Sequence, residues 1–222
     1  LVVFTQGCQF RCLYCANPDT WDLHGGKSIH IEEIVSRAIK EKPYFGEEGG
    51  VTISGGEPTL HRKALIPLFK ALHKEGINTA LDSNGRYFNE EVKELLEETD
   101  YLLLDVKHMN ESVHYKLTAA SNKNVLALAE YREKTQKTMW IRYVLVPGWT
   151  SNPKEIHQLG IHFSDYRSIE KIEIQPYHLL GVHKWKALGL AYPLKNVLTP
   201  TPEMIEETKS ILEKYFKNVV VN

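Results

Sequence analysis

Apolar and polar positions along this 222-residue chain follow two different periods. Short runs rich in β-branched and aromatic residues predict strands, and the segments between them space their apolar residues as a helix with one buried face does. The predicted strands are Val2–Thr5, Gly50–Ser54, Asn78–Asp82, Tyr101–Val106, Met139–Val146 and Ile169–Gln175. The clearest helical stripes are Ala64, Leu65, Leu68 and Leu72, then Val92, Leu95 and Leu96.

Repeated strand-then-helix units predict the fold class. Six such units in one chain imply an α/β fold with a parallel sheet and right-handed crossovers. Eight units would close a barrel in about 250 residues, so six predict a partial, splayed (β/α)6 barrel. No linker, repeat or shift in composition divides the chain, and we expect residues 1–222 to form a single domain. The closing run Asn218–Val221 is expected to be a short extra strand or a frayed end.

Composition and charge exclude several classes of partner. The net charge is −1, and no dense run of Lys and Arg occurs, which argues against nucleic acid or an anionic membrane as the main partner. The apolar runs have the length of strands, so we expect no membrane-spanning segment. The chain has three clustered cysteines and no others, which suits a reducing, cytoplasmic compartment.

Those cysteines, Cys8, Cys12 and Cys15, are spaced as C-x3-C-x2-C. Thiolates are the usual ligands of iron–sulfur clusters, and three of them would leave one iron of a [4Fe–4S] cluster open for another ligand. The spacing favours this interpretation over three alternatives. These are a disulfide with a spare thiol, three buried cysteines, and a three-Cys-one-His zinc site.

Glycine and charged residues gather where the predicted strands end. Parallel α/β folds place their active sites at the carboxyl ends of the strands, so these clusters are expected on one rim. They are Ser54–Pro58, Asp82–Gly85, Asp105–Lys107 and Pro176–His178, with Arg142 inside the fifth strand. Three of these also have a simpler interpretation: Gly55-Gly56 as a tight turn, Asp105 and Lys107 as a salt bridge, and Arg142 as the partner of a carboxylate inside the barrel.

The motif C-x3-C-x2-C, with an aromatic residue before the last cysteine, resembles that of the radical S-adenosylmethionine (SAM) enzymes. Two longer segments are similar to the pyruvate formate-lyase activating enzymes within that superfamily: the run from Cys12 to Gly26, and Pro176–His178 with His183–Trp185. The resemblance implies that the three cysteines hold a [4Fe–4S] cluster whose open iron is chelated by SAM. Reductive cleavage of SAM then gives a radical that takes an α-hydrogen from a glycine of pyruvate formate-lyase.

The resemblance also implies which residues contact the cofactors. Those expected around SAM are Tyr14, Cys15, Ala16, Gly56, Asp105, Val106, Lys107, Arg142 and His178. Two carboxylates at neighbouring strand ends would repel each other, so a Na+ or K+ ion is expected between them. Its expected ligands are the carboxylates of Asp82 and Asp105, with backbone oxygens that the resemblance places at Ser83 and Leu103.

Some departures leave alternatives open. Ala16 stands where close relatives often have His, and Ser83 where they often have Thr, which leaves an activase of another glycyl-radical enzyme, such as anaerobic ribonucleotide reductase. Related activases with an inserted ferredoxin-like domain need further cysteines, which this chain lacks. A zinc-binding interaction module with His24 as fourth ligand is the alternative outside enzymology.

Partners follow from the same resemblance. It implies reduced flavodoxin or ferredoxin as electron donor, and a leading segment before Leu1 that carries further residues near the site. No insertion is large enough to form a lid, so we expect the protein substrate to cover the site. The candidate contacts are the tryptophan-containing segments Asp19–Asp22 and Gly181–Trp185. The simpler interpretation is that both tryptophans pack these loops onto the barrel.

Overall fold

The computed structural model describes residues 1–47 and 49–222. Each of the six predicted strands is present, with ends within one residue of those predicted, and the closing run supplies a seventh. They are β1 (Val2–Thr5), β2 (Gly50–Gly55), β3 (Asn78–Ser83), β4 (Tyr101–Asp105), β5 (Met139–Leu145), β6 (Ile169–Pro176) and β7 (Val219–Val221).

Every strand pairs in parallel with the next one in sequence, and the order across the sheet is β1 to β7. Within the described residues, β1 and β7 each have one neighbour, so the sheet forms an open barrel. The predicted partial barrel is therefore confirmed, with one short strand added at its edge.

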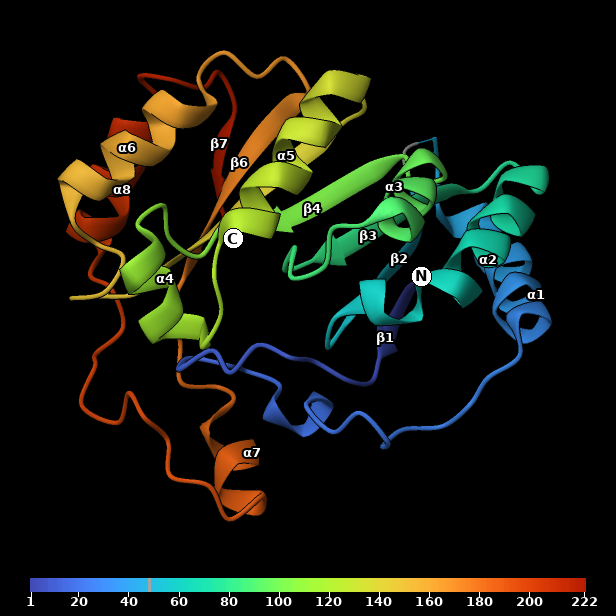
Figure 1. The fold of residues 1–222 in the computed structure, drawn as a ribbon, viewed down its shortest axis with the longest axis horizontal. Coiled ribbons are helices and arrows are strands. Elements are labelled where there is room, and N and C mark those ends of the chain that lie inside the picture. The colour runs from blue at the N-terminus through green and yellow to red at the C-terminus, as the bar shows by residue number, and fades with distance from the viewer. Residues whose placement is uncertain (48) are drawn as a thin grey trace.

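Helices connect the strands on one side of the sheet. They are α1 (Ile31–Glu41), α2 (Arg62–Lys74), α3 (Glu90–Glu97), α4 (Glu111–Thr118), α5 (Lys123–Thr135), α6 (Pro153–Phe163), α7 (Val182–Ala187) and α8 (Pro202–Leu212). Strands that follow one another across a sheet by right-handed crossovers place their helices on the same face. Figure 1 shows α7 apart from the main helical layer, where it contacts the short 3-10 helix η1 (Pro18–Thr20).

The two faces of the sheet differ in burial, as β5 illustrates. Met139, Ile141 and Leu145 are fully buried beneath the helices, whereas Arg142 and Val144 between them are half-buried. Successive side chains of a strand point to opposite faces, so the second set faces the inside of the barrel. The helical side of the sheet is thus the hydrophobic core, and the inner side is available to line a cavity.

Across residues 1–47 and 49–222, no helix has both the length and the apolar character that spanning a bilayer requires.

Candidate functional site

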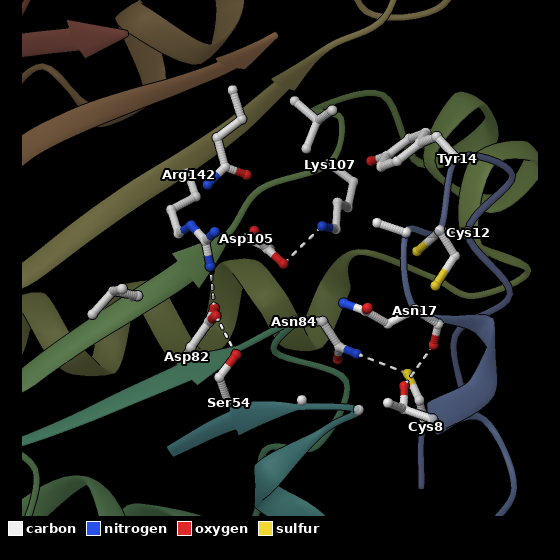
Figure 2. Close-up of a pocket in the computed structure, with 18 of the residues that line it drawn as sticks. Cys8, Cys12, Tyr14, Asn17, Ser54, Asp82, Asn84, Asp105, Lys107 and Arg142 are labelled. Atoms are coloured by element: carbon white, nitrogen blue, oxygen red, sulfur yellow. Dashed lines mark hydrogen bonds and ion pairs between the residues drawn. The ribbon is translucent and has the colours of Figure 1, made fainter. Parts of the chain in front are cut away.

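A cavity of about 660 Å³ occupies the inner side of the barrel at the carboxyl ends of the strands. All but two of the residues predicted to hold cofactors line it, among them the three cysteines, of which Figure 2 labels Cys8 and Cys12. The others are Tyr14, Ala16, Gly56, Asp82, Leu103, Asp105, Lys107, Arg142 and His178. The structure therefore brings together clusters that lie up to 170 residues apart in the chain.

Val106 and Ser83 are the two exceptions. Val106 is 1% exposed and packs in the hydrophobic core, because alternation along the chain turns its side chain away from that of Asp105. Ser83 points to the same outer side, where its hydroxyl donates to Glu57 Oε1 at 2.8 Å. The side chains of these two residues are therefore not part of the cavity wall. Ser83 was expected to bind a cation through its backbone oxygen, and contacts of both residues through the backbone stay a prediction.

The cysteine loop has no regular secondary structure, and backbone hydrogen bonds to two other segments hold it in place. Gly7 N donates to Thr20 O at 2.8 Å. Arg11 N and Leu13 N donate to the last carbonyls of α4, those of Thr118 and Leu117, at 2.8 and 2.9 Å. Helix-terminal carbonyls lack partners within their own helix, so α4 supplies ready acceptors for the loop.

Helix α7 holds the far end of the cysteine loop. The indole N–H of Trp185 donates to Cys15 O at 2.8 Å, and the Trp185 ring packs edge-on against Trp21 at 4.9 Å between ring centres. A Cβ on Gly181 would lie 2.5 Å from Ala16 Cα, so only glycine allows this approach. Lys184 Nζ reaches Asn17 Oδ1 at 2.8 Å.

These contacts bear on the two interpretations of the segment that contains Trp185, which are contact with a protein partner and packing of the loop onto the barrel. Trp185 is 5% exposed and supports the cysteine loop, which favours packing for this side chain. In the sequence, Trp185 is only a Trp in a loop between charged residues. That pattern is compatible both with contact to a protein partner and with support of the cysteine loop.

All three thiols are free. Burial raises the pKa of Cys8 to about 11 and that of Cys12 to about 12, and it also raises the pKa of Cys15. A thiolate in this wall therefore needs a compensating positive charge, which the irons of a cluster would supply. The donor set fits a [4Fe–4S] cluster: three thiols face one cavity, and the chain contains no fourth cysteine.

The thiols do not form a site for a single ion. In residues 1–47 and 49–222, no group of three or more Cys, His, Asp and Glu side chains could hold one metal ion. His24, the suggested fourth zinc ligand, is exposed. The arrangement gives the zinc-module alternative no support.

The Gly55-Gly56 pair is a tight turn that also approaches the cysteine loop. Gly55 has φ +112°, a conformation that favours glycine, and a Cβ on Gly56 would lie 2.1 Å from Gly7 O. Gly56 N donates to Thr5 O at 2.9 Å, so its carbonyl is the backbone group left for a ligand. A carbonyl oxygen suits a protonated amino group, which can only donate hydrogen bonds.

Charged residues on the inner face are paired with one another. Lys107 Nζ lies 2.7 Å from Asp105 Oδ2. Burial alone would lower the pKa of Lys107, but the Asp105 carboxylate, together with Tyr14 and Cys12, outweighs burial and the pKa is raised. Arg142 lies 2.5 Å from Asp82 and 3.6 Å from Glu173. The simpler interpretations, a salt bridge at the rim and a carboxylate partner for Arg142, are therefore both present in the structure.

Asp82 and Asp105 end neighbouring strands, as the cation prediction requires. Each already has a cationic partner, Arg142 for Asp82 and Lys107 for Asp105. Burial raises the pKa of Asp82, and Arg142 opposes this shift. The Na+ or K+ site stays a prediction. Because both carboxylates are already paired, the repulsion that a cation would relieve is smaller than the repulsion between two unpaired carboxylates.

Four residues of the site received no individual role from the sequence. Glu173 and Gln175 line the cavity from β6, where they alternate with buried Ile172 and Ile174; that alternation is a signal that could have found them. Asn84 also lines the cavity, and its side-chain N–H reaches Cys8 Sγ (Figure 2). Glu57 is fully buried behind the wall.

The chain matches a known family model and is similar over most of its length to two proteins of known function. Residues 2–160 match the family model described as the radical SAM superfamily. The chain is 44% identical over 222 residues to the pyruvate formate-lyase 1-activating enzyme of Escherichia coli K12, covering 99% of this chain and 90% of that protein. It is 42% identical over 214 residues to the pyruvate formate-lyase-activating enzyme of Staphylococcus epidermidis, covering 93% and 85%.

Solved structures agree on the fold. The crystal structure of a domain of pyruvate-formate lyase-activating enzyme from Bacteroides vulgatus matches with a TM-score of 0.66 and 26% identity, over 78% of this chain and 98% of that one. Streptococcus suis SuiB bound to S-adenosylmethionine matches with a TM-score of 0.74 over 100% of this chain and 49% of that one. At 15% identity, the second match establishes the fold alone.

Proposed function

The chain belongs to the radical SAM superfamily and, within it, to the pyruvate formate-lyase activating enzymes, and we propose that its protein substrate is pyruvate formate-lyase, on which it forms a glycyl radical. The enzyme is a SAM-dependent oxidoreductase. The alternative substrate is another glycyl-radical enzyme, such as anaerobic ribonucleotide reductase.

One observation carries the proposal: three free thiols share a single cavity with the charged strand ends expected around SAM. Neither group alone indicates a radical SAM enzyme. Buried cysteines pack like small hydrophobic residues, and rim ion pairs are common. Their presence on facing walls of one cavity, in a chain 44% identical to an activating enzyme over nearly its full length, supports a bound cluster beside a bound SAM.

When bound, the [4Fe–4S] cluster and SAM supply one-electron cleavage of SAM to a deoxyadenosyl radical that takes the glycine hydrogen. Cys8, Cys12 and Cys15 hold the cluster in this proposal. The carbonyl of Gly56 would accept from the SAM amino group, and Arg142, which lines the same cavity, would face the SAM carboxylate. Asp105 and Lys107 orient the ribose end, with Tyr14, Ala16, His178 and the backbone of Val106 around the adenosine.

The protein's own contribution is positioning. Lys107 and Asp105 hold each other at 2.7 Å, so each fixes the orientation of the other's charged group in the cavity wall. The Tyr14 ring, 8% exposed, backs the Lys107 ammonium at 5.7 Å and closes the cavity wall beside Cys12. Such a wall excludes water from the side of the site nearest the thiols.

The experiment that tests this proposal uses electron paramagnetic resonance (EPR) on anaerobic mixtures. The reconstituted protein is combined with reductant, SAM and either pyruvate formate-lyase or anaerobic ribonucleotide reductase. We expect a glycyl-radical signal with pyruvate formate-lyase, and none when its acceptor glycine is replaced by alanine. A signal with the reductase alone would favour the alternative substrate, and a signal with neither would contradict the activase function.

Two further assignments complete the proposal. Reduced flavodoxin or ferredoxin is the electron donor, tested by replacing the chemical reductant with each protein in the same EPR assay. The location is cytoplasmic, since three free clustered thiols suit a reducing compartment.

A further inference from the structure

A chain of hydrogen bonds connects the Gly55-Gly56-Glu57 turn to the first cysteine. Glu57 is 0% exposed and accepts four hydrogen bonds, which satisfy its buried carboxylate. Oε1 accepts from Thr59 N at 3.0 Å, Thr59 Oγ1 at 2.6 Å and Ser83 Oγ at 2.8 Å, and Oε2 accepts from Asn84 N at 2.8 Å. Glu57 therefore faces the end of β3 and fixes Ser83 and Asn84 there.

The orientation of the Asn84 carboxamide is determined by its neighbours. Its Oδ1 accepts from Arg86 N at 2.9 Å, which leaves the amino group Nδ2 on the opposite side. Nδ2 donates to Cys8 Sγ at 3.5 Å, and both residues are buried. Figure 2 shows this contact between the end of β3 and the cysteine loop. The Cys8 thiol stands here for the thiolate that would bind iron.

We propose that Asn84 tunes the reduction potential of the iron–sulfur cluster through its hydrogen bond to Cys8, and that Glu57 is the positioning residue that holds Asn84 in place. The inference rests on the proposed function, since it requires that Cys8 bind a cluster. It assigns a role to the glutamate of the Gly-Gly-Glu turn that does not involve contact with SAM.

The physical basis is electrostatic. The reduced cluster carries one more negative charge than the oxidised cluster, and part of that charge lies on the ligating sulfurs. An N–H directed at a sulfur stabilises the more negative state, so it raises the potential. The effect depends on burial because the surrounding low dielectric strengthens the interaction. Asn84 is 7% exposed, which meets that condition.

The test is a potentiometric titration of the cluster-loaded full-length protein, followed by EPR. Asn84→Leu removes the donor, and the isosteric Asn84→Asp replaces it with a carboxylate. Both variants should reduce at a more negative midpoint than the wild type, with the aspartate variant shifted further. If Asn84→Leu fails to fold, Asn84→Asp still gives the comparison.

Asn122→Leu is the matched control. Asn122 is 4% exposed and donates from Nδ2 to the backbone oxygens of His108 at 3.1 Å and Met109 at 2.7 Å, away from the thiols. Its loss should lower the melting temperature and leave the midpoint unchanged.

Two outcomes would overturn the inference: wild-type midpoints in both Asn84 variants, or variants that fold but retain less than about half of the wild-type iron, which would make Asn84 a structural support. A wild-type protein without iron would instead contradict the proposed function.

Discussion

The two faces of the same sheet differ in the polarity and burial of their side chains. On the helical side, each central strand buries an aliphatic residue completely, as Leu81, Leu104 and Ile141 do. On the inner side, the neighbouring positions Asp82, Asp105 and Arg142 are charged and half-buried. Adjacent residues of one strand therefore experience opposite environments.

Residues on the outer face therefore determine the stability of the fold, and residues on the inner face determine the chemistry of the site. The outer face gains its free energy from burying apolar surface, which constrains size and polarity at every position. The inner face contributes little apolar burial, so charged side chains can occupy it if they have partners. Lys107 and Arg142 meet that condition with carboxylates at 2.7 and 2.5 Å. Substitutions on the inner face should consequently reduce SAM binding or cleavage, whereas substitutions on the outer face should reduce stability.

Cys12→Ser should have the largest effect. Serine cannot replace a thiolate that binds iron, so cluster content and SAM cleavage should fall to background while the melting temperature shifts by no more than about 4 °C. Iron analysis, deoxyadenosine production and thermal unfolding measure the three quantities. Full deoxyadenosine production would rule out the assignment of Cys12 as a ligand.

Lys107→Met should weaken SAM binding by about tenfold, equivalent to about 1.4 kcal/mol. Methionine keeps the apolar stem but removes the ammonium that orients the ligand. Calorimetric titration with SAM measures the change. Lys209→Met on α8, where Lys209 lies 3.6 Å from Glu213 and 35% exposed, is the control and should bind SAM normally. Equal affinities in both variants would remove Lys107 from the SAM site.

Trp185→Phe should reduce SAM cleavage and glycyl-radical formation together, by a few-fold. Phenylalanine keeps the contact with Trp21 but loses the hydrogen bond to Cys15 O, which is worth on the order of 1 kcal/mol. Trp140→Phe is the control, since the Trp140 indole N–H has no partner among the described residues. Loss of radical formation with normal SAM cleavage would restore the docking role first expected for Trp185.

Replacing K+ by a large organic cation at constant ionic strength should lower activity only modestly, on the order of twofold. Lys107 and Arg142 already offset most of the repulsion between Asp82 and Asp105. Steady-state SAM cleavage in the two salts measures the effect. Complete dependence on K+ would mean that a bound cation, and not these side chains, neutralises the carboxylates.

Ile141→Ala, on the outer face, should leave SAM cleavage per folded, cluster-loaded molecule unchanged. It should lower the free energy of unfolding by about 2–5 kcal/mol, because it leaves a cavity under the helices. Denaturant unfolding and activity normalised to iron content test this. A loss of normalised activity as large as that of Lys107→Met would abolish the distinction between the two faces.

The fold was largely predictable from the sequence because the outer face follows a simple rule. The period of apolar and polar positions predicted the ends of the strands to within one residue. The clusters of glycine and charged residues at the strand ends were correctly expected on one rim. The side chains that turn away from the cavity, those of Val106 and Ser83, lie at or just after the end of a strand, where one residue decides which face is reached.

Other parts of the site depend on long-range contacts that cannot be predicted from sequence patterns. Trp185 is buried only because α7 folds back onto Cys15, 170 residues earlier in the chain. The role of Asn84 likewise depends on Glu57, which reaches it from another strand end. Such long-range hydrogen bonds leave no periodic signal, so the structure is needed to identify them.

The most direct test of the account is the EPR spectrum of the anaerobically reconstituted and reduced wild-type protein, recorded without and with SAM. The account predicts about four iron atoms per chain and a cluster signal whose line shape changes when SAM is added, because SAM would bind the open iron beside Asp105 and Lys107. A protein that retains zinc and gives no signal, or a cluster signal that SAM leaves unchanged, would contradict it.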